Sequence, residues 1–210
     1  MEPIDVLVGL YGTDDSMDRQ VVKFIMSLWE KCNLDKVKVF CVERECSPIS
    51  VFLRDLIHRV GFHLHSCPLP LADSCLEDTG QFCDWMVNNI GESCWVSIMH
   101  YDVVFVGDYI SFIRTISPLV DAVGTHHDGV VSIRRDTYRR CGVEFRDTDV
   151  KLGCTDVGDL LMLRMREMGA RHLPLSNRNG TGKSDLFVHF RRGSGHGGKG
   201  PDGDSQPHIY

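Results

Sequence analysis

The sequence predicts an α/β domain with a mostly parallel central sheet flanked by helices. In the first half of the chain, short apolar runs alternate with segments whose apolar residues recur at helical spacing. This alternation is typical of parallel strands joined by helices. The length of 210 residues, with 42% hydrophobic and 25% charged residues, is ordinary for one large globular domain. Polar residues interrupt the most apolar run, which indicates where a site lies.

The first strand and helix follow from residues 4–31. Residues 4–10 are an apolar run that ends at Tyr11-Gly12, which predicts a buried strand. Ser16 is expected to cap the following helix. That helix has an apolar stripe at helical spacing, made by Val21, Val22, Ile25, Leu28 and Trp29.

The same pattern repeats through residue 90. Residues 37–42 predict a second strand, and Ser47-Pro48 predicts a helix cap followed by proline at the first helical position. This second helix is expected to end at Gly61. Residues 62–66 predict a third strand, residues 68–78 a loop and residues 80–90 a further helix.

The second half of the chain is less regular. Residues 95–106 are the most apolar stretch, although His100-Tyr101-Asp102 lies inside it. Residues 109–120 are expected to be helical, and residues 130–133 to form a strand that leads into 134–141. Residues 159–168 predict a helix that Gly169 terminates. Before the strand at 130, His126-His127-Asp128 is interpreted as a polar loop that could reach substrate.

The ends and the overall charge limit the class of protein. Residues 193–210 are rich in Gly, Ser, Asp and Pro, so we expect a flexible tail after a domain at residues 1–192. No apolar run is long enough to span a bilayer, and the N-terminus has no secretory signal pattern. Nine cysteines without such a signal favour a cytoplasmic protein. The net charge of −6 does not favour nucleic-acid binding.

His100 and Asp102 are out of place in a buried parallel strand, which should be continuously apolar. Residues two apart on an extended segment point to the same side, so the two side chains could hold one ion. Ligands of open α/β sheets gather beyond the carboxyl ends of the strands. The alternative is that both side chains only form hydrogen bonds with nearby backbone.

The order of these elements resembles the donor half of a GT-A glycosyltransferase, most closely family 2. The resemblance rests on the helix at 80–90 followed by residues 95–105, where a strand at 95–98 leads into His100-Tyr101-Asp102, and then on residues 128–142 and 155–169. It covers about residues 4–190. In this family an apolar strand ends in Asp-x-Asp, whose carboxylate binds a divalent ion that bridges the nucleotide diphosphate.

The resemblance implies a metal site at His100 and Asp102, with His100 standing where the family has its first acid. Some GT-A enzymes return a late histidine to the metal, which makes His189 a third candidate ligand. The alternative for His189 is a hydrogen-bonded core histidine. An imidazole ligand favours Mn²⁺ over Mg²⁺, which prefers oxygen. Two histidines and one carboxylate also occur in non-haem iron oxygenases, whose all-β scaffold does not match this sequence.

Further site residues follow from the same resemblance. The family's acidic motif appears as Thr155-Asp156, which implies Asp156 as the catalytic base, with Asp159 as the alternative. Asp159 could instead simply favour the helix N-terminus through its charge. Six positions match contacts to the nucleotide: Leu10, Tyr11, Gly12, Glu43, Asp84 and Tyr101.

The resemblance therefore implies a metal-dependent hexosyltransferase-like enzyme that moves a sugar from a nucleotide-diphosphate donor to an acceptor hydroxyl, and it favours inversion over retention. The acceptor is open: a small molecule, a glycan or, with least support, a modified nucleic acid. One alternative is a nucleotidyltransferase, although the acidic segment after the first strand lacks the Gly-rich, basic loop expected there. The other is a non-catalytic nucleotide-sugar-binding module of the same fold.

Overall fold

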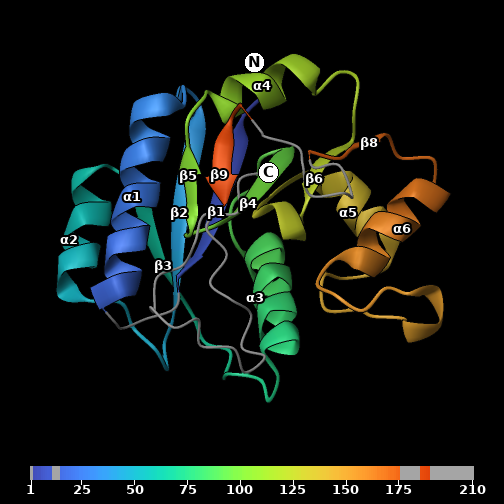
Figure 1. Ribbon diagram of the computed structural model, residues 1–210, viewed down its shortest axis with the longest axis horizontal. Helices are drawn as coiled ribbons and strands as arrows, with labels where there is room; N and C mark the ends of the chain where they lie inside the picture. Colours follow the sequence, from blue (N-terminus) through green and yellow to red (C-terminus); the bar gives the residue numbers. More distant parts are fainter. Residues whose placement is uncertain (1, 11–14, 176–184, 190–210) are drawn as a thin grey trace, which may run out of the picture.

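A seven-stranded sheet with helices on both faces forms the body of the protein (Figure 1). The computed structural model describes residues 2–10, 15–175 and 185–189. The strands of the main sheet are β1 (Ile4–Leu10), β2 (Val37–Arg44), β3 (His63–Cys67), β4 (Trp95–His100), β6 (Ala122–Thr125), β7 (Val130–Arg134) and β8 (His172–Leu173). The helices are α1 (Asp15–Lys31), α2 (Val51–Arg59), α3 (Cys75–Asn89), α4 (Tyr109–Ile116), α5 (Arg135–Cys141) and α6 (Asp159–Glu167), with 3₁₀ turns η1 (His126–Asp128) and η2 (Val150–Leu152).

The strand order is β3-β2-β1-β4-β7-β6-β8, which confirms a mostly parallel sheet. The pairs β1–β2, β1–β4, β2–β3 and β6–β8 are parallel. Strand β7 is antiparallel to both of its neighbours, β4 and β6. As a consequence, β7 begins at the edge of the sheet where β4 ends, and the β6–β7 turn lies at that edge.

Two apolar layers cover the two faces of the sheet. Val6 and Val8 of β1 belong to the layer that packs against α1, α2 and α4. Leu7, between them, belongs to the layer that packs against α3, α5 and α6. The side chains of a strand alternate between faces, so a parallel strand buried on both sides is largely apolar, as β1 is apart from Asp5.

Several predicted boundaries are wrong. Helix α2 begins at Val51 with Ser50 as its cap, whose side chain accepts a hydrogen bond from the amide of Leu53, so Ser47-Pro48 lies before the helix. Helix α3 begins at Cys75 with Ser74 as its cap, inside the segment expected to be a loop. In each case a serine nearer the apolar stripe supplies the oxygen that a helix start requires. Ser16 lies within α1, which begins at Asp15.

The apolar stretch at 95–106 contains two strands. Strand β4 ends at His100, a turn follows at Tyr101-Asp102, and β5 (Val103–Phe105) pairs with β9 (Phe187–His189) in a small antiparallel sheet. The register places Val103 opposite His189. Strands β6 and β8 were not predicted. Among the described residues, no helix is both long and apolar enough to cross a membrane.

A buried ion pair fixes the opposite edge of the sheet. The Asp5 carboxylate contacts the Arg135 guanidinium at 3.1 Å and accepts hydrogen bonds from the amide and hydroxyl of Ser93. Arg135 also donates to the carbonyl of Ile90. Gly91 has φ 69°, and a Cβ there would lie 2.2 Å from the Asp5 carboxylate. Only glycine fits this close approach in that conformation.

We expect Asp5→Ala to lower the free energy of unfolding by about 3–5 kcal/mol, because it leaves the buried Arg135 charge without its partner. Urea unfolding followed by circular dichroism measures the change. Asp55→Ala, at an exposed position of α2, should change stability by less than about 0.5 kcal/mol. Equal stability of the Asp5 variant and the parent protein would contradict this role.

Candidate functional site

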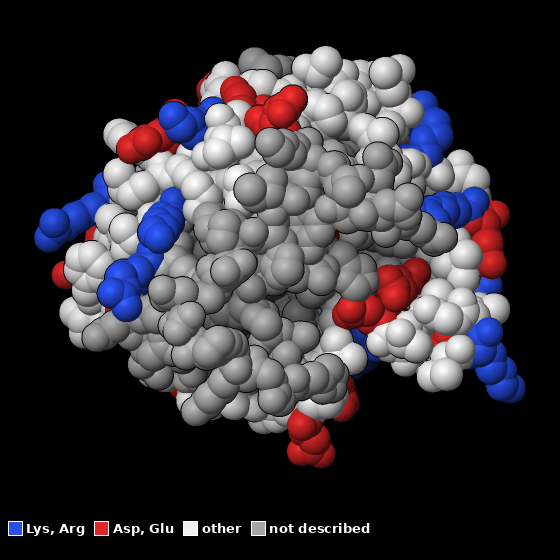
Figure 2. Space-filling model, viewed as in Figure 1, with Lys and Arg blue, Asp and Glu red and all other residues white. Residues whose placement is uncertain are grey.

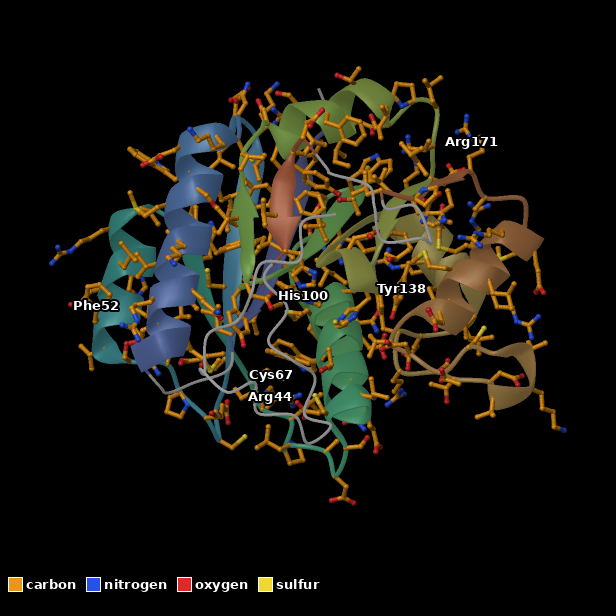
Figure 3. All side chains as sticks on the ribbon, in the orientation of Figure 1. Arg44, Phe52, Cys67, His100, Tyr138 and Arg171 are labelled. Atoms are coloured by element: carbon orange, nitrogen blue, oxygen red, sulfur yellow. The ribbon has the colours of Figure 1, made fainter. Side chains whose placement is uncertain are left out.

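Two segments that are distant in the sequence meet where β4 ends. His100 is the last residue of β4, and Asp102 lies in the turn that follows. His189 is brought to the same place by the β5–β9 pairing, opposite Val103. Figure 3 labels His100 near the centre of the molecule, between the sheet and α3. The three residues proposed as metal ligands from the sequence therefore lie together.

The distances within this group suit a shared divalent ion. His189 Nε2 lies 3.2 Å from Asp102 Oδ1, and His100 Nδ1 lies 3.9 Å from the same oxygen. One ligand atom from each residue lies within 4.8 Å of the other two. Ligands that each stand about 2.1 Å from one ion are separated by about 3–4 Å. The two separations that involve Asp102 fall in this range.

The electrostatic environment of Asp102 also suits a cation. Its Oδ1 is buried and accepts no well-formed hydrogen bond from the part of the chain that the structure describes. Burial by itself would raise the pKa of Asp102, but His189 and His100 more than offset it, and the pKa lies below its ordinary value. A charged, buried oxygen that lacks a good donor is an effective ligand for a positive ion.

His126 joins this group, although sequence reasoning assigned it to a polar loop. Its Nε2 lies 2.9 Å from Nε2 of His100, on the side of the ring away from Asp102. The signal that could have found it is the β6–β7 hairpin, because the turn of a hairpin antiparallel to β4 falls at the end of β4. The sequence prediction contained no β6, so this signal was missed.

The two candidates for the base form one turn before α6. The Asp156 amide donates to the Asp159 carboxylate at 3.1 Å, and the Val157 amide donates to the Asp156 carboxylate at 2.7 Å. Asp159 is the first residue of α6, and its carboxylate stabilises the turn that leads into the helix. A Cβ placed on Gly158 would lie 4.0 Å from the Cβ of His126, so the turn is adjacent to the histidine group.

A cavity of about 360 Å³ opens beside the proposed ligands. Tyr101, His100 and Asp102 line one side of it, together with His126. Helix α3 and the sheet supply the remaining, mostly apolar wall, made by Gly9, Cys75, Asp78, Thr79, Phe82, Cys83, Met86, Ile98 and Met99. The volume is in the range of small-molecule sites. Leu10 is fully buried at the end of β1, while Tyr11 and Gly12 lie outside the described residues.

Glu43, which was expected to contact the nucleotide, is only 2% exposed and binds the backbone just before α2. Its carboxylate accepts hydrogen bonds from the amide of Ile49 at 2.9 Å and from the hydroxyl of Ser66 at 3.3 Å. It also forms an ion pair with Arg54 at 2.8 Å. A carboxylate with its lone pairs committed in this way has little capacity for a ligand. The geometry favours a structural role for Glu43.

Asp84, also expected near the nucleotide, faces α5 instead and is not among the residues that line the cavity. Its carboxylate accepts hydrogen bonds from the Tyr138 hydroxyl and from the amides of Phe145 and Arg146. Figure 3 labels Tyr138 between α3 and α6. Burial raises the pKa of Asp84 to about 6, although these donors oppose the shift. Asp84 therefore holds residues 144–147 in place.

Among the described residues on the face shown in Figure 2, basic side chains form no single patch. In the described part of that face, Lys and Arg are scattered around the edge and interspersed with acidic side chains. A nucleic-acid acceptor thus gains no support from this view, since phosphate binding requires clustered positive charge.

Comparison with known proteins identifies the fold. No protein-family model and no curated protein matches the sequence. Solved structures do: a mannosyltransferase of Pyrobaculum calidifontis in complex with GDP-Man and Mn²⁺ has a TM-score of 0.58 at 14% identity, over 82% of this chain and 54% of that one. TarS of S. aureus has a TM-score of 0.60 at 11% identity, over 88% of this chain and 36% of TarS. The glycosyltransferase GlyE of Streptococcus pneumoniae has a TM-score of 0.53 at 15% identity, over 84% of this chain and 46% of GlyE.

These likenesses establish the fold as the GT-A-like fold of nucleotide-diphospho-sugar transferases. The chain spans little more than half of the mannosyltransferase and smaller shares of the other two proteins. Helices on both faces of the sheet and a site beyond the end of β4 agree with the fold that the sequence predicted.

The raised pKa of Asp84 predicts a pH-dependent contribution to stability. The folded state favours the neutral carboxyl, so its contribution is present below about pH 4 and is lost as pH rises through about 6. From pH 4 to 7, the free energy of unfolding of the parent protein should fall relative to Asp84→Asn by on the order of 2–3 kcal/mol. Urea unfolding across this range measures the difference.

The matched control is Asp55→Asn, at an exposed position of α2. Its difference from the parent protein should be independent of pH. If the free energy of unfolding changed with pH by the same amount in the parent protein and in Asp84→Asn, the pKa of Asp84 would be ordinary and the prediction wrong.

Proposed function

We propose that this chain is a metal-dependent glycosyltransferase that moves a sugar from a nucleotide-diphosphate donor to an acceptor hydroxyl with inversion. The observation that carries the proposal is the group His100, Asp102 and His189, which lies beside a cavity beyond the end of β4. The fold supplies the context, because open α/β sheets bind ligands at this edge.

His100, Asp102 and His189 would hold the ion, and the two imidazoles favour Mn²⁺ over Mg²⁺. When bound, the metal supplies Lewis-acid stabilisation of the charge that develops on the departing diphosphate. The mannosyltransferase of similar fold was solved with GDP-Man and Mn²⁺, which supports this choice of ion. The same two-histidine, one-carboxylate set leaves positions for diphosphate oxygens.

The donor would occupy the cavity beside Tyr101. Donor contacts from Tyr11 and Gly12 remain a prediction from the sequence, whereas Leu10 is fully buried and could contribute only its backbone. TarS has been solved with UDP and with UDP-GlcNAc, and the mannosyltransferase with GDP-Man, so both nucleotides belong in a test of binding. Glu43 and Asp84 would support the site indirectly, through the backbone that each of them holds.

Asp156 would act as the general base. Its side chain is half-buried in a turn beside His126, and His126 in turn contacts His100. From there it would accept the proton of the acceptor hydroxyl as that oxygen attacks the anomeric carbon. Asp159 accepts the backbone amide of Asp156, a bond that orients the turn. A single base opposite the leaving group is the arrangement that inversion requires.

The cysteines support a reducing compartment such as the cytosol. All nine lie in the described part of the chain, and every one is a free thiol. Unpaired cysteines in this number are typical of proteins kept reduced.

We expect Asp102→Ala to abolish metal-dependent donor binding, because it removes the one negatively charged ligand. Isothermal titration calorimetry with Mn²⁺ and each of UDP, GDP and TDP measures this. Asp55→Ala should bind as the parent protein does. Absence of Mn²⁺-dependent nucleoside diphosphate binding by the parent protein would refute the proposed function.

We expect Asp156→Asn to retain Mn²⁺ and donor binding while slowing transfer at least 100-fold, since only the proton acceptor is lost. Release of UDP or GDP from sugar donors, with simple glycosides as acceptors, measures turnover. Turnover by Asp156→Asn equal to that of the parent protein would move the base to Asp159. Donor binding without any turnover by the parent protein would favour a non-catalytic binding module.

A further inference from the structure

His100 uses its two ring nitrogens in two directions. Its Nδ1 faces Asp102 Oδ1 at 3.9 Å, on the side where the proposed ion would lie. Its Nε2 faces Nε2 of His126 at 2.9 Å. The two rings meet edge to face, with centroids 4.3 Å apart and an interplanar angle of 64°. The contact between the histidines is therefore a directed one.

A neutral imidazole has one N–H donor and one nitrogen lone pair. If His100 donates from Nε2 to His126, its Nδ1 keeps a lone pair directed at the metal position. If His126 is the donor, the proton of His100 lies on Nδ1, which then cannot ligate. The hydrogen-bond partner of Nε2 thus decides whether Nδ1 of the same histidine can bind a metal. Partners of this kind contribute about 10–100-fold to metal affinity.

We propose that His126 is a positioning residue: when the metal is bound, it accepts a hydrogen bond from Nε2 of His100 and so keeps Nδ1 of His100 directed at the metal position. The inference rests on the metal site of the proposed function. It adds a residue that does not itself touch the metal.

The fold holds His126 firmly enough for this role. The Asp128 carboxylate accepts the amide and the hydroxyl of Thr125 and so closes the η1 turn in which His126 lies. The amide of His100 donates to the carbonyl of Gly129 at 2.8 Å, which ties the end of β4 to the same turn. Gly129 has φ 76°, and a Cβ there would lie 2.8 Å from the His189 ring. The turn is therefore packed against both proposed histidine ligands.

The test compares Mn²⁺ and Co²⁺ affinity of the parent protein with that of His126→Ala and His126→Gln by calorimetry. We expect His126→Ala to bind each metal at least about tenfold more weakly. Glutamine can place an amide oxygen near the position of the imidazole Nε2 and accept the same proton. We therefore expect His126→Gln to recover most of the affinity. His58→Ala, which removes an exposed histidine of α2, should bind as the parent protein does.

Nitrogen-15 NMR of the protein bound to diamagnetic Zn²⁺ gives a readout that a merely structural role would not change. At about pH 8, where imidazole is ordinarily neutral, the Nε2 proton of His100 should be hydrogen-bonded and exchange slowly with water in the parent protein, and exchange faster in His126→Ala. A proton on Nε2 of His126 that is donated to His100 in the Zn²⁺-bound parent protein would overturn the proposal.

Unchanged metal affinity in His126→Ala, with metal binding by the parent protein intact, would overturn the role of His126 and leave the proposed function standing. Failure of the parent protein to bind either metal would instead refute the metal site itself, and this inference with it.

Discussion

A largely buried carboxylate between two imidazoles is the constraint around which the site is organised. Burying the charge of Asp102 is costly unless cationic or donor groups surround it. His100 and His189 meet this need, but they come from segments almost ninety residues apart and can approach only if β5 pairs with β9 in one register. The end of β4, the Tyr101-Asp102 turn and the small second sheet are thus parts of one arrangement.

The protein contains several buried acids, and their hydrogen bonds separate those that support the fold from the one that suits a metal. Asp5 is paired with Arg135, Glu43 with Arg54 and the start of α2, and Asp84 with Tyr138 and two backbone amides. In each of these the carboxylate is satisfied by the chain. Asp102 differs, because its Oδ1 is buried without a well-formed hydrogen bond from the described residues. Unsatisfied polar atoms that persist in a fold call for an explanation, and a cation supplies one.

The sheet topology explains why the proposed ligands and the proposed base lie close together. Reversal of direction at β7 places the β6–β7 turn beside the end of β4, and this turn carries His126. The turn before α6 packs next to His126 through Gly158, where a side chain would have little room. His126 therefore stands between the metal group and the turn that carries Asp156. The chain spans only part of the length of proteins with similar folds, and the acceptor is left to experiment.

The sequence by itself determined the α/β class, the strands and helices of the first half and the pair His100 and Asp102. These features are local: apolar periodicity reports burial, and a spacing of two on an extended segment reports a shared side. Tertiary structure alone decided that His189 reaches Asp102, that His126 contacts His100, and that Glu43 and Asp84 are occupied by the chain. These contacts depend on strand direction, register and helix packing between distant segments, which no local pattern encodes.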